Sequence, residues 1–288
     1  MLDHQGRELA RAEGRAAVAD AAAPEVAAGA VAELCAAAAR TAGSALPADV
    51  VWAGLSGAGR EAARSAVELE LGRAGIAVHV RVGTDVLAAF HDVFPEGPGI
   101  LLIAGTGSIA WARAEDGREG RVGGWGHHIG DEGSGFAIGV DALRRVARHA
   151  DGRAPETTLQ ARVLEHLGLT RVDELVTWAS RASRAQVADL APLVAESARA
   201  GDAVAGEILV EAIDELMSHV VTILENMGPW SRPPPVALAG GLIQRGGPLR
   251  GPLEAALATR HIRPMDEEPD PALGAAKLAL QLAERGAD

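Results

Sequence analysis

Apolar residues along the chain follow two spacing patterns, one that predicts strands and one that predicts helices. Short apolar runs that end in glycine or a polar turn are typical of buried β-strands. Such runs span residues 49–55, 78–82, 100–104 and 236–239. Residues 109–114 alternate between apolar and polar, as a strand with one buried face would, and residues 261–264 predict one more short strand.

Longer stretches, in which apolar residues return every three or four positions, predict amphipathic helices. They span residues 22–42, 61–75, 86–91, 136–149, 157–167, 172–180, 184–200, 203–226, 248–258 and 271–284. Strands and helices alternate in the first third of the chain, which favours an α/β fold. The strongest apolar face belongs to residues 203–226. A face of this kind is either core or a dimer surface, and on this ground we expect a homodimer.

Composition narrows the class of protein. Asp and Glu number 39 against 27 Lys and Arg, so the formal net charge is −12, which disfavours a general nucleic-acid binder. The single cysteine, Cys35, rules out a disulfide framework or a set of Cys ligands. No apolar stretch is long enough to cross a bilayer, and no charged-then-apolar leader opens the chain. We therefore expect a cytoplasmic protein with no membrane partner.

Glycine-dense loops are concentrated within about forty residues in the middle of the chain. They read GTGS at 105–108, GGWG at 123–126 and GDEGSG at 130–135. Glycine permits tight turns and lets main-chain N–H groups approach an anion, and the hydroxyls of Thr106 and Ser108 could add donors. GTGS alone is equally compatible with an ordinary hairpin turn, but the three loops in this order are a sharper signal.

This ordered set of loops resembles the N-acetylglucosamine kinase family and its relatives, the ATPase activators of the benzoyl-CoA reductase type. Both belong to the actin-like ATPase superfamily. The resemblance implies a two-lobed, ribonuclease H-like α/β fold, with mixed sheets flanked by helices and a helical insertion in the second lobe. It also implies that the final helix packs on the first lobe. The N-terminal lobe would then comprise residues 1–97 and 271–288, and the C-terminal lobe residues 98–270.

The resemblance further implies phosphoryl transfer from MgATP to the 6-hydroxyl of an amino hexose. Asp85 would be the catalytic base, although it could instead cap the helix that follows it. The residues implied to bind the sugar are Thr84, Asp85, Gly123, Gly124, Asp131 and Glu132. Those implied to bind ATP are Gly105, Thr106, Gly107, Ser108, Gly240 and Gly241. No residue is assigned as a metal ligand, and no basic residue is assigned to the phosphates.

Each of the two weaker motifs also has a purely structural interpretation. Asp131 and Glu132 could simply place negative charge at the N-terminus of the helix that follows them. Gly240 and Gly241 could form a plain strand-to-helix turn. The resemblance favours the binding role for both motifs.

The chain departs from the family pattern at three places. The family's opening strand carries a glycine-rich acidic turn (DGGGT or similar) that binds phosphate, and no such motif occurs here, so we expect the sequence to start inside the family's second strand. Two sugar-contacting Asn residues are also missing, one in the 15–24 loop and one at Ile109. The resemblance implies an amino hexose of the N-acetylglucosamine or glucosamine type, but without these Asn residues the sugar could be glucosamine, another hexosamine or a different small polyol.

Two other functions remain open. The first is an ATPase that activates a partner enzyme, but those activators use cysteines to hold a cluster, and a lone Cys35 argues against this role. The second is a non-catalytic nucleotide- or sugar-binding protein, for which the absent phosphate motif is the reason. The presence of both Asp85 and Asp131 argues against the second role.

Overall fold

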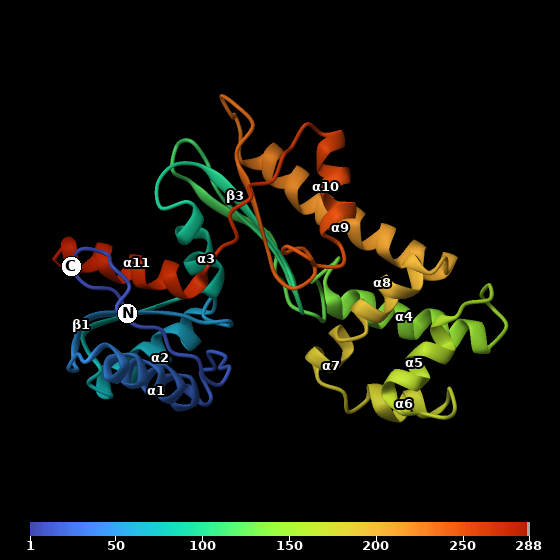
Figure 1. The fold of residues 1–288 in the computed structure, drawn as a ribbon, viewed down its shortest axis with the longest axis horizontal. Helices are drawn as coiled ribbons and strands as arrows, with labels where there is room; N and C mark the ends of the chain where they lie inside the picture. Colours follow the sequence, from blue (N-terminus) through green and yellow to red (C-terminus); the bar gives the residue numbers. More distant parts are fainter. Residues whose placement is uncertain (287–288) are drawn as a thin grey trace. The chain divides into compact units, whose positions relative to one another are not determined.

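The computed structural model describes residues 1–286 and contains two compact units, each with its own sheet (Figure 1). Unit 1 comprises Met1–Glu96 and the chain from Pro269 onward, and unit 2 comprises Gly97–Glu268. Each of these boundaries lies within two residues of the one expected from the sequence.

Unit 1 is built on two parallel strands, β1 (Ala48–Gly54) and β2 (Ala77–Gly83), which pair in register from Ala48 with Ala77 to Gly54 with Gly83. Helices α1 (Pro24–Ala42) and α2 (Glu61–Arg73) bury alanine and aliphatic side chains against them. Helices α3 (Asp85–Val93) and α11 (Pro271–Glu284) pack together on β1, with α11 on the side of the strands away from α1 and α2 (Figure 1).

A close helix contact fixes α3 in unit 1. Gly274 of α11 is buried against α3, and a Cβ added there would lie only 1.9 Å from the carbonyl oxygen of Ala88. Lys277, the one lysine of the chain, donates to Asp92 Oδ1 at 2.7 Å, and the Asp92 side chain is only 9% exposed. The position of α3, which begins at Asp85, therefore depends on α11.

Replacing Gly274 with alanine should separate α11 from α3. Overpacking typically costs about 1–3 kcal/mol, and the better helix propensity of alanine returns up to about 1 kcal/mol. We expect a net loss of about 1–2 kcal/mol in the free energy of unfolding of unit 1, measured by calorimetry. Gly72→Ala in α2 is the control, because no atom lies within 4 Å of its added Cβ. Equal stability of the two variants would contradict the prediction.

Unit 2 contains a four-stranded sheet in the order β5-β4-β3-β6. Strands β3 (Gly99–Ala104), β4 (Ser108–Arg113) and β5 (Glu119–Gly123) form an antiparallel meander, and β6 (Val236–Ala239) pairs parallel to β3. β3 is buried along almost its whole length, whereas β4 alternates, as the sequence predicts. The predicted α/β class is thus present in both units.

The helices of unit 2 cover this sheet and extend beyond it (Figure 1). They are α4 (Gly135–Ala150), α5 (Leu159–Leu167), α6 (Glu174–Ala179), α7 (Arg184–Ala188), α8 (Ala191–Arg199), α9 (Ala203–Met227) and α10 (Arg250–Thr259).

Two predicted elements of unit 2 were wrong. The single helix expected at 184–200 is two helices, α7 and α8, because Pro192 lacks an N–H and sits in the first turn of α8, where none is needed. The strand expected at 261–264 is only an isolated bridge between Val236 and Pro264. A proline cannot donate to a ladder, which accounts for the missing strand.

The long apolar face of α9 belongs to the core of unit 2. Ile208, Leu216 and Val220 are each at most 1% exposed and pack with the residues of β3 and β4. The homodimer expected from the sequence rested on this face, so that argument no longer supports it. Within residues 1–286, no helix combines the length and the apolar character needed to cross a membrane.

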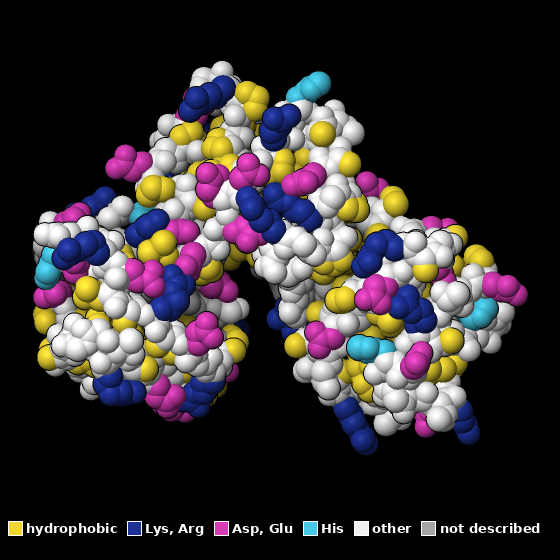
Figure 2. Space-filling model, in the orientation of Figure 1, with side chains coloured by type: hydrophobic (Ala, Val, Ile, Leu, Met, Phe, Trp, Pro, Cys, Tyr) yellow, Lys and Arg dark blue, Asp and Glu magenta, His cyan; other side chains and the backbone are white. Residues whose placement is uncertain are grey.

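Charges of both signs are mixed on the visible face of each unit (Figure 2). Among the ion pairs of unit 2, Arg145 contacts both Glu207 at 3.0 Å and Glu211 at 2.8 Å. Arginine side chains on this face are thus interspersed with carboxylates, a pattern unlike the basic stripe of a nucleic-acid binder.

Candidate active site

Four glycine-rich loops of unit 2 are joined by backbone hydrogen bonds. Gly124 N donates to Ser108 O at 3.0 Å, and Gly135 N donates to Gly105 O at 2.8 Å. Leu242 N donates to Ala104 O at 3.1 Å. The predicted GTGS, GGWG and GDEGSG loops and the turn with the predicted Gly240 and Gly241 (AGGL, 239–242), spread over about 140 residues of sequence, are therefore neighbours at one end of the sheet.

The GTGS turn joins β3 to β4 and is held by a hydrogen bond within the turn and by another to the GDEGSG loop. Gly105 N donates to Gly107 O at 2.9 Å. Ser108 is buried, and its hydroxyl donates to Glu132 O at 2.6 Å. The hydrogen of this hydroxyl is thus used to join two loops, whereas Thr106 at the tip is exposed. Of the two predicted hydroxyl donors to phosphate, Thr106 is therefore the one with an exposed side chain.

Asp131 lies directly against this turn. Its carboxylate accepts from Ser108 N at 3.5 Å through Oδ1, and a Cβ added to Gly107 would lie 3.0 Å from both carboxylate oxygens. The residue adopts a left-handed backbone conformation (φ 62°) and is 4% exposed. Such a conformation is unusual for a residue with a side chain and is found where the surroundings enforce it.

Arg184 is the second partner of Asp131, and sequence reasoning missed it. Arg184 Nη2 donates to Asp131 Oδ2 at 2.9 Å from the first residue of α7, 53 positions further along the chain. No local motif marks this arginine, because its neighbours in the sequence are an ordinary helix start. Glu132, the other predicted acid, contributes its backbone carbonyl to Ser108 and keeps its side chain partly exposed.

Gly123 and Gly124 have positive φ values of 74° and 68°. A Cβ on Gly123 would lie 2.1 Å from His219 Nε2, and one on Gly124 would lie 2.7 Å from Ile109 Cδ1. Both positions therefore require glycine for two reasons, conformation and space. Beside them, Trp125 is 64% exposed, with the Arg121 guanidinium 4.4 Å from its ring centroid.

Gly240 and Gly241 follow β6 and differ sharply in their surroundings. Gly240 has φ 92°, and a Cβ there would lie 2.4 Å from Ala104 O. At Gly241 no atom lies within 4 Å of an added Cβ. The turn is thus packed backbone to backbone at Gly240 and open around the Cβ position of Gly241.

Asp85 and Thr84 belong to unit 1 and lie at the carboxyl end of β2. The alternative role of Asp85 as helix cap is wrong, because Thr84 is the N-cap and its Oγ1 accepts from Leu87 N at 3.1 Å. Asp85 is the first residue of α3, and its Oδ1 accepts from the adjacent Val86 N at 3.0 Å. Asp85 is exposed, but the protein atoms around its carboxyl group raise the pKa by desolvation, against the opposing effect of backbone hydrogen bonds from Val86 and from Asp85 itself. A carboxylate of this kind can accept a proton.

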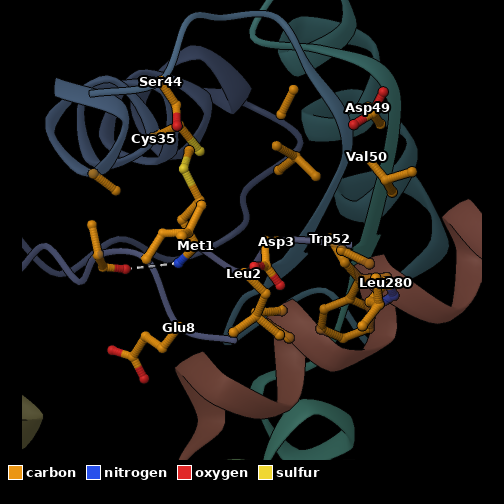
Figure 3. Close-up of a pocket in the computed structure, with 18 of the residues that line it drawn as sticks. Met1, Leu2, Asp3, Glu8, Cys35, Ser44, Asp49, Val50, Trp52 and Leu280 are labelled. Carbon is orange, nitrogen blue, oxygen red and sulfur yellow. Dashed lines mark hydrogen bonds between the residues drawn. The ribbon is translucent and has the colours of Figure 1, made fainter. Parts of the chain in front are cut away.

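A cavity of about 550 Å³ lies elsewhere in unit 1 (Figure 3). It borders β1 from Ala48 to Trp52, and its walls come from α1, α11 and the first twelve residues. Met1 N donates to Ala10 O at 2.9 Å on one wall, and burial raises the pKa of Cys35 on another. None of the predicted site residues lines this mostly apolar cavity, so we do not assign the chemistry to it.

The chain matches the sequence profile of the BadF/BadG/BcrA/BcrD ATPase family over residues 1–279. It is 36% identical over 188 residues to the N-acetyl-D-glucosamine kinase of Dictyostelium discoideum, covering 63% of this chain and 59% of that protein. It is 33% identical over 192 residues to the N-acetylmuramic acid/N-acetylglucosamine kinase of Clostridium acetobutylicum, covering 66% and 63%. The chain thus spans about three-fifths of the length of these curated relatives.

A solved structure agrees over more of the chain. The crystal structure of a putative N-acetylglucosamine kinase from Chromobacterium violaceum superposes with a TM-score of 0.80 at 32% identity. The match covers 95% of this chain and 90% of that one. The fold expected from the resemblance to N-acetylglucosamine kinases is thereby confirmed.

Proposed function

The chain belongs to the BadF/BadG/BcrA/BcrD ATPase family, and from this premise we propose that it is an ATP-dependent kinase of an amino hexose. The observation that carries the proposal is that Thr84, and not Asp85, caps α3. The Asp85 carboxylate is thus not used as a cap, and at a strand end with a raised pKa it is suited to act as a base. The sugar and hexosamine kinases among the relatives support the same reaction.

In the proposed reaction, Asp85 accepts the proton of the sugar 6-hydroxyl. The hydroxyl oxygen forms a bond to the γ-phosphorus of ATP, the bond from that phosphorus to the bridging oxygen breaks, and ADP leaves. Such transfers depend mainly on positioning and on neutralising charge at the phosphates.

We propose that the loops of unit 2 hold the two substrates. The exposed Thr106 and the backbone of the GTGS turn would hold phosphates, and the open side of Gly241 would admit the adenosine. Gly124, Asp131 and Glu132 would bind the sugar, with Asp131 as the buried hydroxyl acceptor. Mg²⁺ would neutralise phosphate charge; it usually binds through phosphates and only one or two carboxylates, so it would enter with ATP.

ADP release from MgATP should depend on an added hexosamine. The panel is N-acetylglucosamine, glucosamine, N-acetylmuramic acid and glucose, each with and without enzyme, and the product is identified by mass spectrometry. We expect the amino sugars to give turnover above the sugar-free rate. Hydrolysis of ATP at one rate with or without sugar would instead indicate the activator function, and binding without turnover a non-catalytic protein.

We further propose that the protein acts in the cytoplasm. No membrane-crossing helix occurs within residues 1–286, and its proposed substrates, ATP and a free sugar, are small soluble molecules.

A further inference from the structure

Helix α7 is seated unusually close to the start of α4. A Cβ on Gly139 would lie 2.0 Å from Val187 O, and one on Gly135 would lie 3.2 Å from the Ala188 Cβ. Ser183 closes the start of α7 with a capping box, in which Ser183 and Gln186 exchange two hydrogen bonds. The start of α7 is therefore fixed relative to α4 and to the loop that precedes it.

This placement brings Arg184 to the rim of the Asp131 site. The contact joins one guanidinium nitrogen, Nη2, to one carboxylate oxygen, Oδ2. The Asp131 side chain is 5% exposed, whereas the Arg184 side chain is 45% exposed. A guanidinium has five N–H donors in a rigid fork. This guanidinium donates a hydrogen bond to Asp131, and the half-exposed side chain lies beside the residue proposed to hold the sugar.

The charges around Arg184 leave it available to an anion. Asp131 is the single acidic group that contacts it among the described residues. The Arg184 charge also acts on His127, whose pKa is lowered by burial first and then by His128 and Arg184, against Asp131. Arg184 and Asp131 together carry no net charge, so a monoanion beside them is tolerated better than a dianion would be.

We propose that Arg184 forms a carboxylate subsite of the sugar site and thereby determines specificity for amino sugars that carry an acidic substituent. This proposal rests on the proposed sugar-binding function. A carboxylate matches the planar fork of the guanidinium in two parallel hydrogen bonds. The sugar hydroxyls would occupy Asp131, while the acidic substituent would lie on the exposed edge of Arg184.

The test compares an acidic and a neutral sugar that share one ring. Binding of N-acetylmuramic acid and N-acetylglucosamine is measured by calorimetry without ATP, and kcat/KM is measured for both with MgATP. Arg184→Gln should lower the affinity ratio of acidic to neutral sugar by roughly tenfold or more, the usual effect of losing a charged hydrogen bond. Arg184→Lys keeps the charge and should retain most of the ratio.

Arg144→Gln is the matched control, because Arg144 is an exposed arginine of the same unit that pairs with Asp141 at 3.0 Å. Its ratio should equal that of the unmodified protein. Equal losses for both sugars in Arg184→Gln would mean that Arg184 only positions Asp131, and would overturn the subsite. So would an unmodified protein that binds the neutral sugar but not the acidic one. Selective binding without turnover would support the subsite and refute the kinase function.

Discussion

Replacing Asp85 with asparagine is expected to lower kcat by about 10²–10⁴-fold, the usual contribution of a positioned base. Asparagine keeps the size of the side chain and can still accept the hydrogen bond from Val86 N, but it cannot take the proton of the sugar hydroxyl. The measurement is sugar-dependent ADP release under saturating substrate, with circular dichroism to verify folding. Activity within tenfold of the unmodified protein would refute the role of Asp85.

The same substitution should leave stability unchanged or slightly higher at neutral pH. A raised pKa means that the folded state holds the Asp85 proton more tightly than the unfolded chain does. Ionisation of Asp85 therefore opposes folding, an effect that is absent below the unfolded pKa and complete above the folded one. Asparagine removes this effect, so the melting temperature of Asp85→Asn should equal or exceed that of the parent at pH 7.

The raised pKa also sets the acid limb of the activity profile. The base must be ionised, so kcat/KM should fall as the pH drops through a pKa above about 3.9, the value of an unperturbed aspartate. Asp49→Asn, which removes an exposed carboxylate of β1, is the control and should keep both the profile and the rate. An acid limb at or below the unperturbed value would contradict the environment described for Asp85.

Elements set by local periodicity could be predicted closely from the sequence. The hairpin expected at 100–104 and 109–114 is observed as Gly99–Ala104 and Ser108–Arg113. Alternating burial and a glycine turn determine such a hairpin locally, without help from distant residues. The break between α7 and α8 was missed because alanine-rich periodicity runs through it, although Pro192 marked the place.

The site was predictable as a set of motifs but not as a set of contacts. The glycine loops can be recognised in the sequence because glycine is favoured where the backbone has a positive φ and where no space is left for a Cβ. Which hydroxyl of GTGS is taken by Glu132 O depends on a loop 24 residues away, and Arg184 reaches Asp131 from another helix. Likewise, the choice of Thr84 over Asp85 as N-cap follows from side-chain geometry that spacing alone does not resolve.

Gly240→Ala is expected to have the largest effect on stability among the glycine variants. Alanine at φ 92° is strained by about 1–3 kcal/mol, and overpacking against a backbone carbonyl adds about 1–3 kcal/mol. Because Ala104 O also accepts from Leu242 N, the new methyl group would push the AGGL turn away from the GTGS turn. We expect a fall in the unfolding free energy of unit 2 of about 2–6 kcal/mol, as the sum of the two effects.

Gly241→Ala separates the packing of this turn from its proposed contact with adenosine. Its added Cβ meets no atom within 4 Å, so the melting temperature should stay within a few degrees of the parent. If adenosine lies against Gly241, the methyl group should nevertheless raise the KM for ATP by roughly 5- to 150-fold, since overpacking of about 1–3 kcal/mol corresponds to that range. Under this proposal, calorimetric unfolding shows the larger loss of stability for Gly240→Ala, and ATP saturation curves show the larger rise in KM for Gly241→Ala. An unchanged KM for ATP in Gly241→Ala would place the adenosine elsewhere, and an unchanged stability in Gly240→Ala would contradict the close backbone packing of the turn.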